Sequence, residues 1–492
     1  MNTYACFAER FLQSPTRLFL EADCGESFSY ADVDRATARY ANFLIGFGLK
    51  SGDRVAVQVD KSPQAVFLYL ACLRAGLCYL PLNNAYQQGE IRYFLGDAEP
   101  AVAICSPQNV EWFAKLCAQA NVPHTFTLDQ NGAGSFTDSA RSAATKFITA
   151  TSNPDDLAVI IYTSGTTGRS KGAMVTHGNL TSNAQVLCDA WKITSADVLI
   201  HALPIFHIHG LFVALNTTLL SGAKLIFHRK FDAHAVSAAL PHATLLMGVP
   251  TFYTRLLTEP SFTRESCLSM RLFVSGSAPL LLDTFNEFRE RSSHTILERY
   301  GMSEAGMICS NPYEGERRGG TVGKTLPGVN LRIDGGDTGG IEIRGANVFS
   351  GYWRMPEKTR EEFTADGYFK TGDIGTIDKD GYVSIVGRAK DLIISGGFNV
   401  YPKEIELVID AIPGVAESAV IGLPHPDFGE AVTAVIVRDK QDSSLNEADV
   451  VAHVKTELAS FKVPKRVHFV EELPRNTMGK VQKSILRERF SR

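Results

Sequence analysis

Residues 162–172 combine side chains that suit the binding of an anion. The segment reads Tyr-Thr-Ser-Gly-Thr-Thr-Gly-Arg-Ser-Lys-Gly, with three glycines, five serine or threonine hydroxyls and two cations. Glycines let backbone N–H groups turn towards an anion, hydroxyls donate further hydrogen bonds, and lysine adds a point charge. The alternative is an ordinary polar surface loop. The spacing is not that of a Walker A loop, so we predict a phosphate-binding loop of another class.

The elements around this loop follow an alternating pattern. The apolar run 157–161 predicts a buried strand directly before the loop. Residues 55–59, 78–82 and 101–105 predict earlier strands, separated by helices over 63–74 and 88–98. Strands that alternate with helices predict a parallel sheet covered by helices on both faces. Further strands are expected at 198–203, 244–249 and 271–275.

The pattern changes towards the C-terminus. From Val322, short strands with glycine-rich turns predict an antiparallel β-subdomain. Beyond Gly387 we expect a small α+β domain, with helices at 402–412 and 446–460 and strands at 417–421 and 432–437. The predicted fold is therefore α/β, with two doubly wound subdomains and a β-barrel-like subdomain in residues 1–387, and a mobile domain in 388–492.

Composition narrows the functional classes. The chain has 492 residues, 45% of them hydrophobic and 21% charged, with a net charge of −4. These values are typical of a globular protein and do not favour nucleic acid or an anionic membrane as a partner. The sequence contains neither an apolar run long enough to span a membrane nor a signal-peptide pattern. Nine cysteines without a C-x-x-C pair indicate reduced thiols and a cytoplasmic enzyme.

Six further stretches carry residues that can take part in chemistry. They are Pro204–Gly210, Ser275–Pro279, Tyr300–Glu304, Tyr368–Asp373, Gly387–Asp391 and Pro474–Lys480. With the loop at 162–172, and in this order, they resemble the acyl-adenylating superfamily of acyl-CoA synthetases, adenylation domains and firefly luciferase. The resemblance covers essentially the whole chain. It implies attack of a carboxylate on the α-phosphate of ATP, followed by transfer of the acyl group from AMP to a thiol, usually that of coenzyme A.

The resemblance also implies roles for individual residues. It assigns the phosphates of ATP to Thr163, Ser164, Gly165, Thr166, Thr167 and Lys171. It assigns the rest of the nucleotide to Ser277, Ala278, Pro279, Glu298, Arg299, Tyr300, Ser303, Asp373 and Arg388. It assigns Mg²⁺ to Glu304 and Thr166, which count as catalytic residues together with His207 and Lys480. Two anions meet in the first step, so cations and oriented donors must offset their repulsion.

The C-terminal motifs imply a change of conformation between the two steps. The family's equivalent of Lys480 bridges the attacking carboxylate and the α-phosphate, and the small domain turns about the equivalent of Lys390. The segment Ser395, Gly396 and Gly397 resembles the lining of the channel for the pantetheine arm of coenzyme A. Acylation of Lys480 by a protein-modifying enzyme would remove its charge and is expected to stop the first step.

The acyl substrate is indicated by a narrower resemblance. Residues 205–212, 250–255, 297–302 and 397–403 together resemble the malonyl-CoA synthetase family. There the arginine that matches Arg255 holds the distal carboxylate of malonate, and arginine suits this role because it binds a carboxylate bidentately. His207 is expected to gate the acyl pocket. Further expected lining residues are Ser275, Gly276 and Met302.

Two departures from the commonest family pattern leave alternatives open. Ile208 stands where threonine is frequent, and Ala305-Gly306 replaces a more polar pair. A methylmalonyl-CoA synthetase, a broader short- or medium-chain acyl-CoA synthetase and an adenylation enzyme that loads a carrier protein therefore remain alternatives. A luciferase-like oxygenase and an inactive nucleotide-binding protein belong to other classes, and the intact set of motif residues argues against loss of activity.

Overall fold

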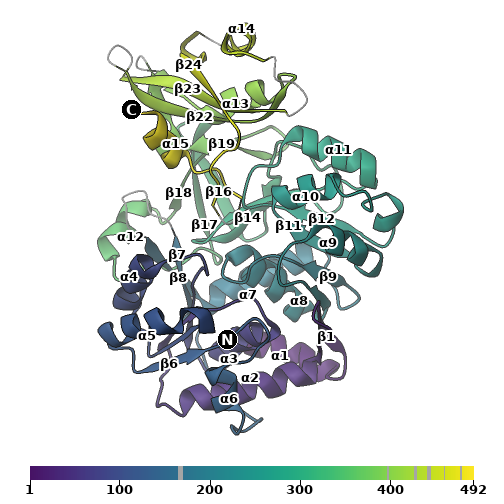
Figure 1. The fold of residues 1–492 in the computed structure, drawn as a ribbon, viewed down its shortest axis with the longest axis vertical. Coiled ribbons are helices and arrows are strands. Elements are labelled where there is room, and N and C mark those ends of the chain that lie inside the picture. The colour runs from purple at the N-terminus through teal and green to yellow at the C-terminus, as the bar shows by residue number, and fades with distance from the viewer. Residues whose placement is uncertain are drawn as a thin grey trace. The chain divides into compact units, whose positions relative to one another are not determined.

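The computed structural model describes residues 1–163, 170–395, 398–425, 429–439, 445–458, 460–476 and 479–491 (Figure 1). Its packing divides the chain into two compact units, which are described separately. The first combines Met1–Asn330 with Arg344–Gly367, and the second combines Leu331–Ile343 with Tyr368–Arg492. The four-stranded sheet thus packs with the C-terminal segment. The predicted boundary at residues 387 and 388 does not coincide with this division, and the hinge there stays a prediction.

The first unit contains a six-stranded sheet in the order β6-β5-β3-β4-β7-β8. Its strands are β3 (Arg54–Gln58), β4 (Cys78–Pro81), β5 (Val102–Cys105), β6 (His124–Thr127), β7 (Leu157–Thr163) and β8 (Lys171–Thr176). Helices between these strands are α3 (Pro63–Arg74), α4 (Gln88–Ala98), α5 (Val110–Gln119) and α6 (Ser135–Ala140), with a 3₁₀ helix at Pro107–Asn109. All neighbouring strands are parallel except β7 and β8. The predicted alternation of strands and helices is confirmed.

The second sheet of this unit has nine strands in the order β15-β14-β13-β12-β11-β9-β10-β1-β2. They are β1 (Leu18–Ala22), β2 (Ser27–Ser29), β9 (Val198–His201), β10 (Lys224–Phe227), β11 (Leu245–Gly248), β12 (Leu272–Ser275), β13 (Leu297–Met302), β14 (Gly306–Ser310) and β15 (Lys324–Thr325). The strands from β1 to β13 along this order are parallel, whereas β2, β14 and β15 are antiparallel to their neighbours.

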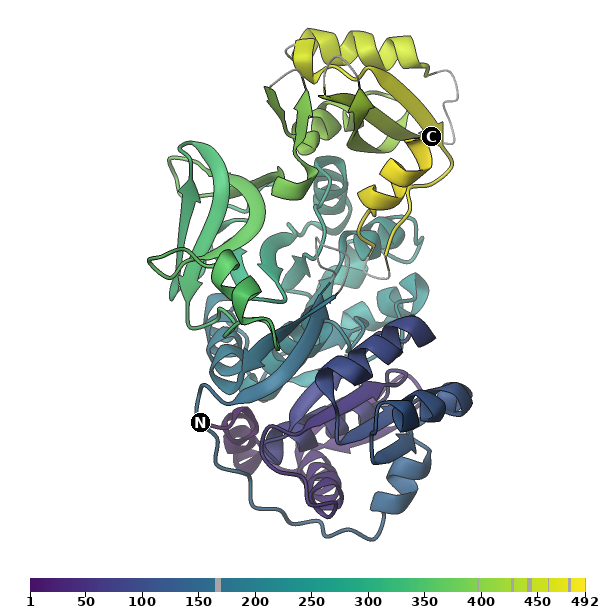
Figure 2. The same cartoon turned by 90° about the vertical axis from the view of Figure 1, so that its left-hand side faces the viewer.

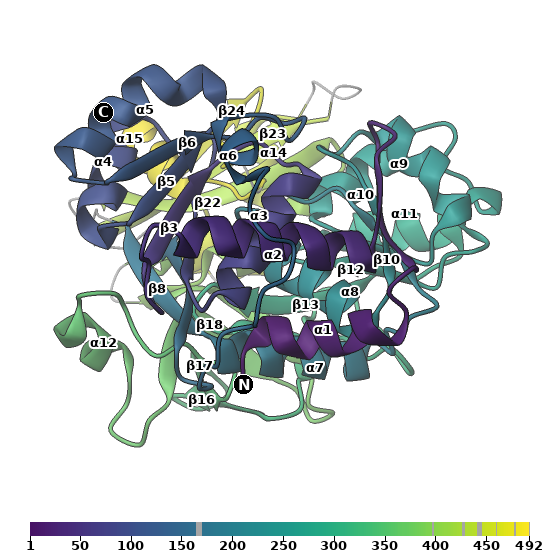
Figure 3. The ribbon, with the colours of Figure 1, turned by 90° about the horizontal axis from the view of Figure 1, so that it is seen from below.

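The other helices of the first unit fall into a longer and a shorter group. The longer ones are α1 (Thr3–Gln13), α2 (Tyr30–Ile45), α7 (His177–Ala190) and α11 (Leu282–Ser292). Shorter ones are α8 (Asn216–Ser221), α9 (Ala233–Ala239), α10 (Pro250–Leu257) and α12 (Pro356–Glu362), a π-helix at His209–Leu215, and 3₁₀ helices at Leu240–His242 and Glu265–Cys267. Helices α1 and α2 lie beside each other in the view of Figure 3 and are in contact.

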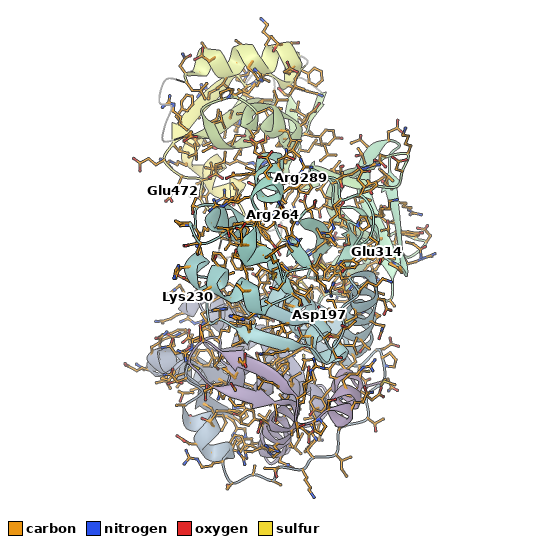
Figure 4. The ribbon with its side chains drawn as sticks, turned by 90° about the vertical axis from the view of Figure 1, so that its right-hand side faces the viewer. Asp197, Lys230, Arg264, Arg289, Glu314 and Glu472 are labelled. Carbon is orange, nitrogen blue, oxygen red and sulfur yellow. The ribbon has the colours of Figure 1, made fainter. Side chains whose placement is uncertain are left out.

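The parallel strands of the nine-stranded sheet bring three of the motifs to one edge. The stretch 204–210 follows β9, the stretch 275–279 begins at the end of β12, and the stretch 300–304 covers the end of β13. Because the carboxyl ends of parallel strands meet at the same edge, ligands of such sheets bind there. The start of β9 is fixed by Asp197, labelled in Figure 4, whose two carboxylate oxygens each accept a 2.7 Å hydrogen bond from Arg271.

The second unit contains a four-stranded and a five-stranded sheet. The first has β16 (Val329–Asp334), β17 (Thr338–Gly345), β18 (Phe369–Ile377) and β19 (Val383–Arg388), in that order. The second has β20 (Ile393–Ser395), β21 (Phe398–Val400), β22 (Val415–His425), β23 (Gly429–Arg438) and β24 (Arg466–Val470). The helices of this unit are α13 (Pro402–Asp410), α14 (Glu447–Glu457) and α15 (Lys483–Phe490), with 3₁₀ turns at Ala389–Asp391 and Ser460–Lys462. The predicted antiparallel and α+β regions are confirmed.

Strand β23 shows how the five-stranded sheet is covered. Val432, Ala434 and Ile436 pack into a core with α13 and α14, whereas Val435 packs into a separate core with Leu486 of α15. Successive side chains of a strand point to opposite faces, so the helices cover both faces of this sheet. The yellow helices of Figure 2 are α14 and α15. Within the described residues no helix is long and apolar enough to cross a membrane, and all nine cysteines are free thiols.

Candidate active site

The predicted phosphate loop joins two antiparallel strands of the first unit. Thr163, the last residue of β7, lies opposite Lys171, the first residue of β8. The strand predicted before the loop is therefore confirmed, while its antiparallel return was not predicted. Tyr93 of α4 donates a 2.8 Å hydrogen bond to the carbonyl of Ser170 and so fixes the end of the loop. The expected phosphate ligands Ser164, Gly165, Thr166 and Thr167 lie outside the described residues.

A buried acid lies beside the two ends of this loop. The Glu304 side chain is 7% exposed and accepts 3.2 Å hydrogen bonds from the hydroxyls of Thr163 and Tyr352. Burial raises the pKa of the Glu304 carboxyl, and these hydrogen bonds and Lys171 act in the opposite direction. The Lys171 ammonium lies 4.2 Å from the centre of the Tyr352 ring. Sequence analysis did not identify Tyr352, because a single aromatic residue after a Ser-Gly pair has no distinctive signal.

Lys171 is also paired with an acid that the sequence did not single out. Its ammonium lies 3.4 Å from a carboxylate oxygen of Glu362, at the end of α12, and Lys358 lies 3.1 Å from the same oxygen. Lys171 is 7% exposed, so its charge is held by Glu362 and by the Tyr352 ring within the protein. An arriving phosphate would compete with Glu362 for this ammonium.

The residues expected beside the nucleotide base come together at the ends of β12 and β13. Ser275 and Glu298 are register partners in these adjacent parallel strands. Glu298 is 5% exposed and accepts a 3.1 Å hydrogen bond from the backbone N–H of Leu280, which fixes the turn between them. Ser277 has a positive φ of 71° within that turn. The remaining residues expected here are half-buried or exposed, namely Ala278, Pro279, Tyr300, Met302 and Ser303.

Arg299 is buried without an acidic partner among the described residues. It is 3% exposed, and its Nε and Nη2 atoms have no hydrogen-bond partner there. Burial lowers the pKa of the Arg299 guanidinium to about 9. A Cβ atom at Gly276 would lie only 2.5 Å from the guanidinium carbon, so glycine at this position makes room for the arginine.

Two more buried polar atoms lie on the elements around Arg299. Ser275, at the end of β12, is fully buried, and its hydroxyl has no partner among the described residues. The same holds for Nε2 of His209, whose Nδ1 lies 3.4 Å from the Ser277 hydroxyl. Burial, followed by the charge of Arg299, lowers the pKa of His209 well below its usual range. Buried polar groups are rarely left unpaired, so this cluster is suited to an anionic or strongly polar ligand.

Arg255, the arginine expected to hold the distal carboxylate, lies in a different environment. Helix α10 buries Phe252, Tyr253, Leu256 and Leu257, and Arg255 is on its exposed face. A carboxylate bound there would remain in solvent, where an ion pair contributes little. Arg299, which was expected beside the nucleotide, is the arginine that the structure places in a buried setting.

The segment after β9 carries the other expected acyl-site residues. His207 is half-buried, and its Nδ1 accepts a 3.2 Å hydrogen bond from the backbone N–H of His209. Ile208 is buried and lines a small cavity together with Phe212, Ser303 and Glu304. The departure from threonine therefore places an apolar side chain in a wall that also contains polar residues.

In the second unit, the expected ribose-binding acid is paired with the expected ribose-binding arginine. Asp373 of β18 and Arg388 of β19 are register partners, and Nε of Arg388 lies 2.9 Å from a carboxylate oxygen of Asp373. Asp373 is 3% exposed, and its backbone N–H donates to the hydroxyl of Thr371. One carboxylate can accept hydrogen bonds from both an arginine and a diol, since its two oxygens offer several lone pairs.

Lys480 of the same unit is hydrogen-bonded to Asn476. Its backbone N–H donates to the Asn476 side chain, and the Asn476 N–H donates to the Lys480 carbonyl. Burial lowers the pKa of the Lys480 ammonium to about 8, and the charge of Arg388 acts in the same direction while Asp373 opposes it. The Lys480 ammonium therefore has a lowered pKa and is close enough to Asp373 and Arg388 to feel their charges.

The predicted hinge residue belongs to a short 3₁₀ turn. Burial lowers the pKa of Lys390, which is flanked by Asp391. Asp391 accepts a 2.8 Å hydrogen bond from Arg487 of α15, and Lys483 of α15 lies 2.6 Å from Glu406 of α13. Of the expected pantetheine segment, Ser395 is buried at the end of β20, whereas Gly396 and Gly397 lie outside the described residues.

Comparison with known proteins places these features in one enzyme family. Residues 7–353 match the model of the AMP-binding enzyme family, and residues 404–480 match that of the AMP-binding enzyme C-terminal domain. The chain belongs to the AMP-binding enzyme family. It is therefore an AMP-forming acyl-CoA ligase, an acid–thiol ligase that uses ATP and coenzyme A as co-substrates.

Individual relatives cover nearly the whole chain. The ATP-bound crystal structure of MatB from Rhodopseudomonas palustris superposes with a TM-score of 0.97 at 54% identity, covering 100% of this chain and 99% of that one. The malonate–CoA ligase of Arabidopsis thaliana is 33% identical, over 98% of this chain and 88% of the relative. A feruloyl-CoA synthase of an Amycolatopsis species is 36% identical, over 95% of this chain and 94% of the relative.

Proposed function

We propose that the protein joins malonate to coenzyme A through a malonyl-adenylate, releasing pyrophosphate and AMP. The observation that carries this proposal is the buried guanidinium of Arg299, which has unpaired nitrogens within the described residues. The only carboxyl group of a monocarboxylate is the one that reacts. Malonate has a second carboxylate, which could neutralise this cation. The similarity to a malonate–CoA ligase supports the same substrate.

Arg299 replaces Arg255 as the proposed partner of the distal carboxylate. The Nε and Nη2 atoms of Arg299 offer two donors to one carboxylate, and the buried hydroxyl of Ser275 and Nε2 of His209 supply further polar contacts. A carboxylate loses its hydration in such a site, so a charged and hydrogen-bonding partner is required. Arg255 has no comparable setting because its side chain is exposed.

The activation step brings the reacting carboxylate to the α-phosphate of ATP. Lys171 is proposed to leave Glu362 and bind the outgoing phosphates, and Lys480 to neutralise the carboxylate and the α-phosphate as they meet. Glu304 fits a Mg²⁺ ligand because it is a buried carboxylate close to the phosphate loop. The ion would supply positive charge to the phosphates, and Thr166 is its other proposed ligand.

The transfer step requires a different arrangement of catalytic groups. We place its pivot at Lys390, where a few residues can absorb a large change in φ and ψ. The pairs Asp391–Arg487 and Glu406–Lys483 lie on the C-terminal side of the pivot and would rotate with α15 as one body. Ser395 and the two glycines after it are proposed to line the path of the coenzyme A thiol.

One assay tests the substrate assignment. Pyrophosphate release is measured with ATP and coenzyme A across malonate, methylmalonate, acetate, succinate and a medium-chain fatty acid. We expect the highest kcat/KM with malonate, because a second carboxylate at the distance that malonate provides is needed to neutralise Arg299. A preference for acetate or the fatty acid would contradict the malonate proposal, while the assignment to the ligase family would stand.

Acylation of Lys480 is a proposed means of control. A pKa of about 8 gives the amine a larger neutral and nucleophilic fraction at neutral pH than an ordinary lysine has. The acylated side chain carries no charge and would not support the activation step. Mass spectrometry of protein purified from its native host checks whether the modification occurs.

A further inference from the structure

Another buried cation of the first unit, Lys61, lies outside the motifs. Lys61 follows β3 and directly precedes Ser62, the residue that caps the start of α3. Its side chain is 9% exposed, and the ammonium donates hydrogen bonds to the carbonyls of His201, at 2.8 Å, and His228, at 2.7 Å. It also lies 4.3 Å from the centre of the Phe227 ring.

These two carbonyls stand at the carboxyl ends of neighbouring strands. His201 is the last residue of β9, and His228 directly follows β10. The His201 carbonyl also accepts a 3.1 Å hydrogen bond from the His228 backbone N–H, so both of its lone pairs are used. The ammonium therefore joins an element of the six-stranded sheet to two strands of the nine-stranded sheet.

The third hydrogen bond of Lys61 determines the tautomer of a buried histidine. Nδ1 of His201 lies 2.8 Å from the Lys61 ammonium, and Nε2 of His201 lies 2.9 Å from the carbonyl of Gly210. A carbonyl can only accept, so Nε2 must carry a proton, and Nδ1 of the neutral ring then accepts from Lys61. An ammonium has three hydrogens, and all three find acceptors here.

Lys61 and His201 together carry one positive charge, and this charge is on Lys61. Burial, followed by the charge of Lys61, lowers the pKa of His201 to about 3, so the imidazole stays neutral. Burial also lowers the pKa of Lys61, whereas Asp23 favours its charged form. The contact with the Phe227 ring further stabilises the ammonium.

Gly210 connects this pair to the acyl site. It lies in the first turn of the π-helix His209–Leu215, directly after His207, Ile208 and His209. A Cβ atom at Gly210 would lie 2.1 Å from the carbonyl of Pro204, so the segment folds closely back on itself. Any shift of the Gly210 carbonyl would therefore be passed to the three acyl-site residues that precede it.

We propose that Lys61 is a positioning residue for the acyl pocket and acts through the hydrogen bonds Lys61–His201–Gly210. Lys61 fixes the tautomer of His201, and His201 then holds the Gly210 carbonyl and with it the positions of His207 and His209. The proposal rests on the assignment of this segment to the acyl site, and it does not depend on which acid is the preferred substrate.

The test compares substitutions of Lys61 and His201, the two side chains of the Lys61–His201–Gly210 relay of hydrogen bonds. Lys61→Met keeps the length of the side chain and removes all three donors. We expect kcat/KM for the acid, measured by ATP–pyrophosphate exchange, to fall about 10²-fold, since small misplacements of acyl-site groups have effects of this size. The KM for ATP should stay unchanged, because among the described residues Lys61 binds His201 and His228 and makes no contact with Thr163, Lys171 or Glu304.

Substitutions of His201 show whether the hydrogen bonds or the bulk of the ring matter. His201→Gln retains an acceptor for Lys61 and a donor for Gly210, and it should stay within about tenfold of the wild type. His201→Leu has neither group and should match Lys61→Met. If Lys61→Met fails to fold, the comparison of His201→Gln with His201→Leu still tests whether these hydrogen bonds position the acyl pocket.

Arg74→Met is the matched control for the loss of a buried cation. Arg74 lies at the other end of α3, is 6% exposed, and donates to the carbonyls of Asp34 and Phe147. The Arg74→Met variant should have a lower melting temperature, but the KM of its folded molecules for the acid should not change. The amount of folded enzyme is determined from the adenylate formed in a single turnover. Equal losses for ATP and acid in Lys61→Met, equal activities of the two His201 variants, or the same kinetic defect in Arg74→Met would each overturn the proposal.

The design separates this proposal from the substrate assignment. All variants are assayed with the acid on which the wild-type enzyme is most active. A wild type that prefers another acid would contradict the malonate proposal and leave the relay test intact, whereas unchanged acid kinetics in Lys61→Met would refute the relay alone.

Discussion

The buried charges of the two units differ in what neutralises them. In the first unit, Arg299 has no acidic partner among the described residues, and Ser275 and His209 nearby also have unpaired polar atoms. In the second unit, Asp373 is paired with Arg388, and Asp391 is paired with Arg487. A buried charge without a partner is costly, so a ligand is the natural complement of the first cluster. In the second unit these charges are paired by residues of the same unit, and the part beyond Lys390 is the body that is proposed to rotate.

The largest expected effect concerns Lys480, the proposed catalytic lysine of the second unit. Lys480→Ala should reduce adenylate formation about 10³-fold or more, because its charge stabilises the meeting of two anions. Thioester formation from supplied acyl-adenylate and coenzyme A should be largely retained. Both half-reactions are measured by single-turnover kinetics. An equal loss of both would show that Lys480 supports the structure of its unit and has no special part in activation.

The second prediction tests whether the unpaired cluster of the first unit is a substrate site. Arg299→Met should lower kcat/KM for malonate about 10²- to 10³-fold, the equivalent of about 3–4 kcal/mol, because the distal carboxylate loses its partner. Activity with acetate should change much less. The melting temperature of the ligand-free protein should stay equal or rise, since an unpaired buried charge is removed.

Arg255→Met is the matched control for Arg299→Met. It removes an arginine from the exposed face of α10, and malonate activity should stay near that of the wild type. A strong and malonate-specific loss in this variant, with little effect in Arg299→Met, would restore Arg255 as the carboxylate ligand. Uniform loss across all acids in Arg299→Met would indicate a structural arginine.

The third prediction concerns movement of the part of the second unit that follows Lys390. Lys390→Pro restricts φ at the proposed pivot and should slow thioester formation at least about tenfold while adenylate formation continues. Pyrophosphate release in the absence of coenzyme A reports the first step, and acyl-CoA formation reports the second. Normal turnover of the complete reaction would exclude Lys390 as the pivot.

The smallest expected effect is a dependence on pH. The folded-state pKa of Lys480 is lowered to about 8, so the side chain is charged below this pH and loses its proton above it. Adenylate formation should therefore be constant below pH 8 and fall up to about tenfold per pH unit above it. Thioester formation from supplied acyl-adenylate serves as the control. A profile of adenylate formation that stays flat to pH 10 would contradict this role of the Lys480 charge.

Much of the fold could be predicted because the relevant signals are local. The apolar run 157–161 predicted a strand, and the helix predicted over 63–74 has the bounds that the structure gives to α3. The antiparallel return of the phosphate loop at β8 was missed, since β8 reads as a short polar-to-apolar segment without a turn signal of its own. The pairing of the four-stranded sheet with the C-terminal unit was missed because it depends on contacts between distant segments.

The choice between Arg255 and Arg299 as the carboxylate ligand shows more clearly what sequence analysis can and cannot predict. The spacing of Phe252, Tyr253, Leu256 and Leu257 marks one face of a helix, and Arg255 falls outside it. This signal was available in the sequence and argues for exposure. For Arg299 the sequence offered only a position within a strand. Its burial follows from Gly276 on the neighbouring strand, which leaves the space that the guanidinium fills.

The sequence by itself determined the enzyme family and the order of the motifs, because each motif carries its chemistry within a few consecutive residues. The roles of the individual site residues stay predictions. Only the tertiary structure decided which cations are buried, which of them have partners, and that Lys61 contacts His201, which in turn binds the Gly210 carbonyl. Burial and pairing depend on atoms brought together from distant parts of the chain. The hydration that those atoms displace makes an unpaired Arg299 or a fully bonded Lys61 energetically significant.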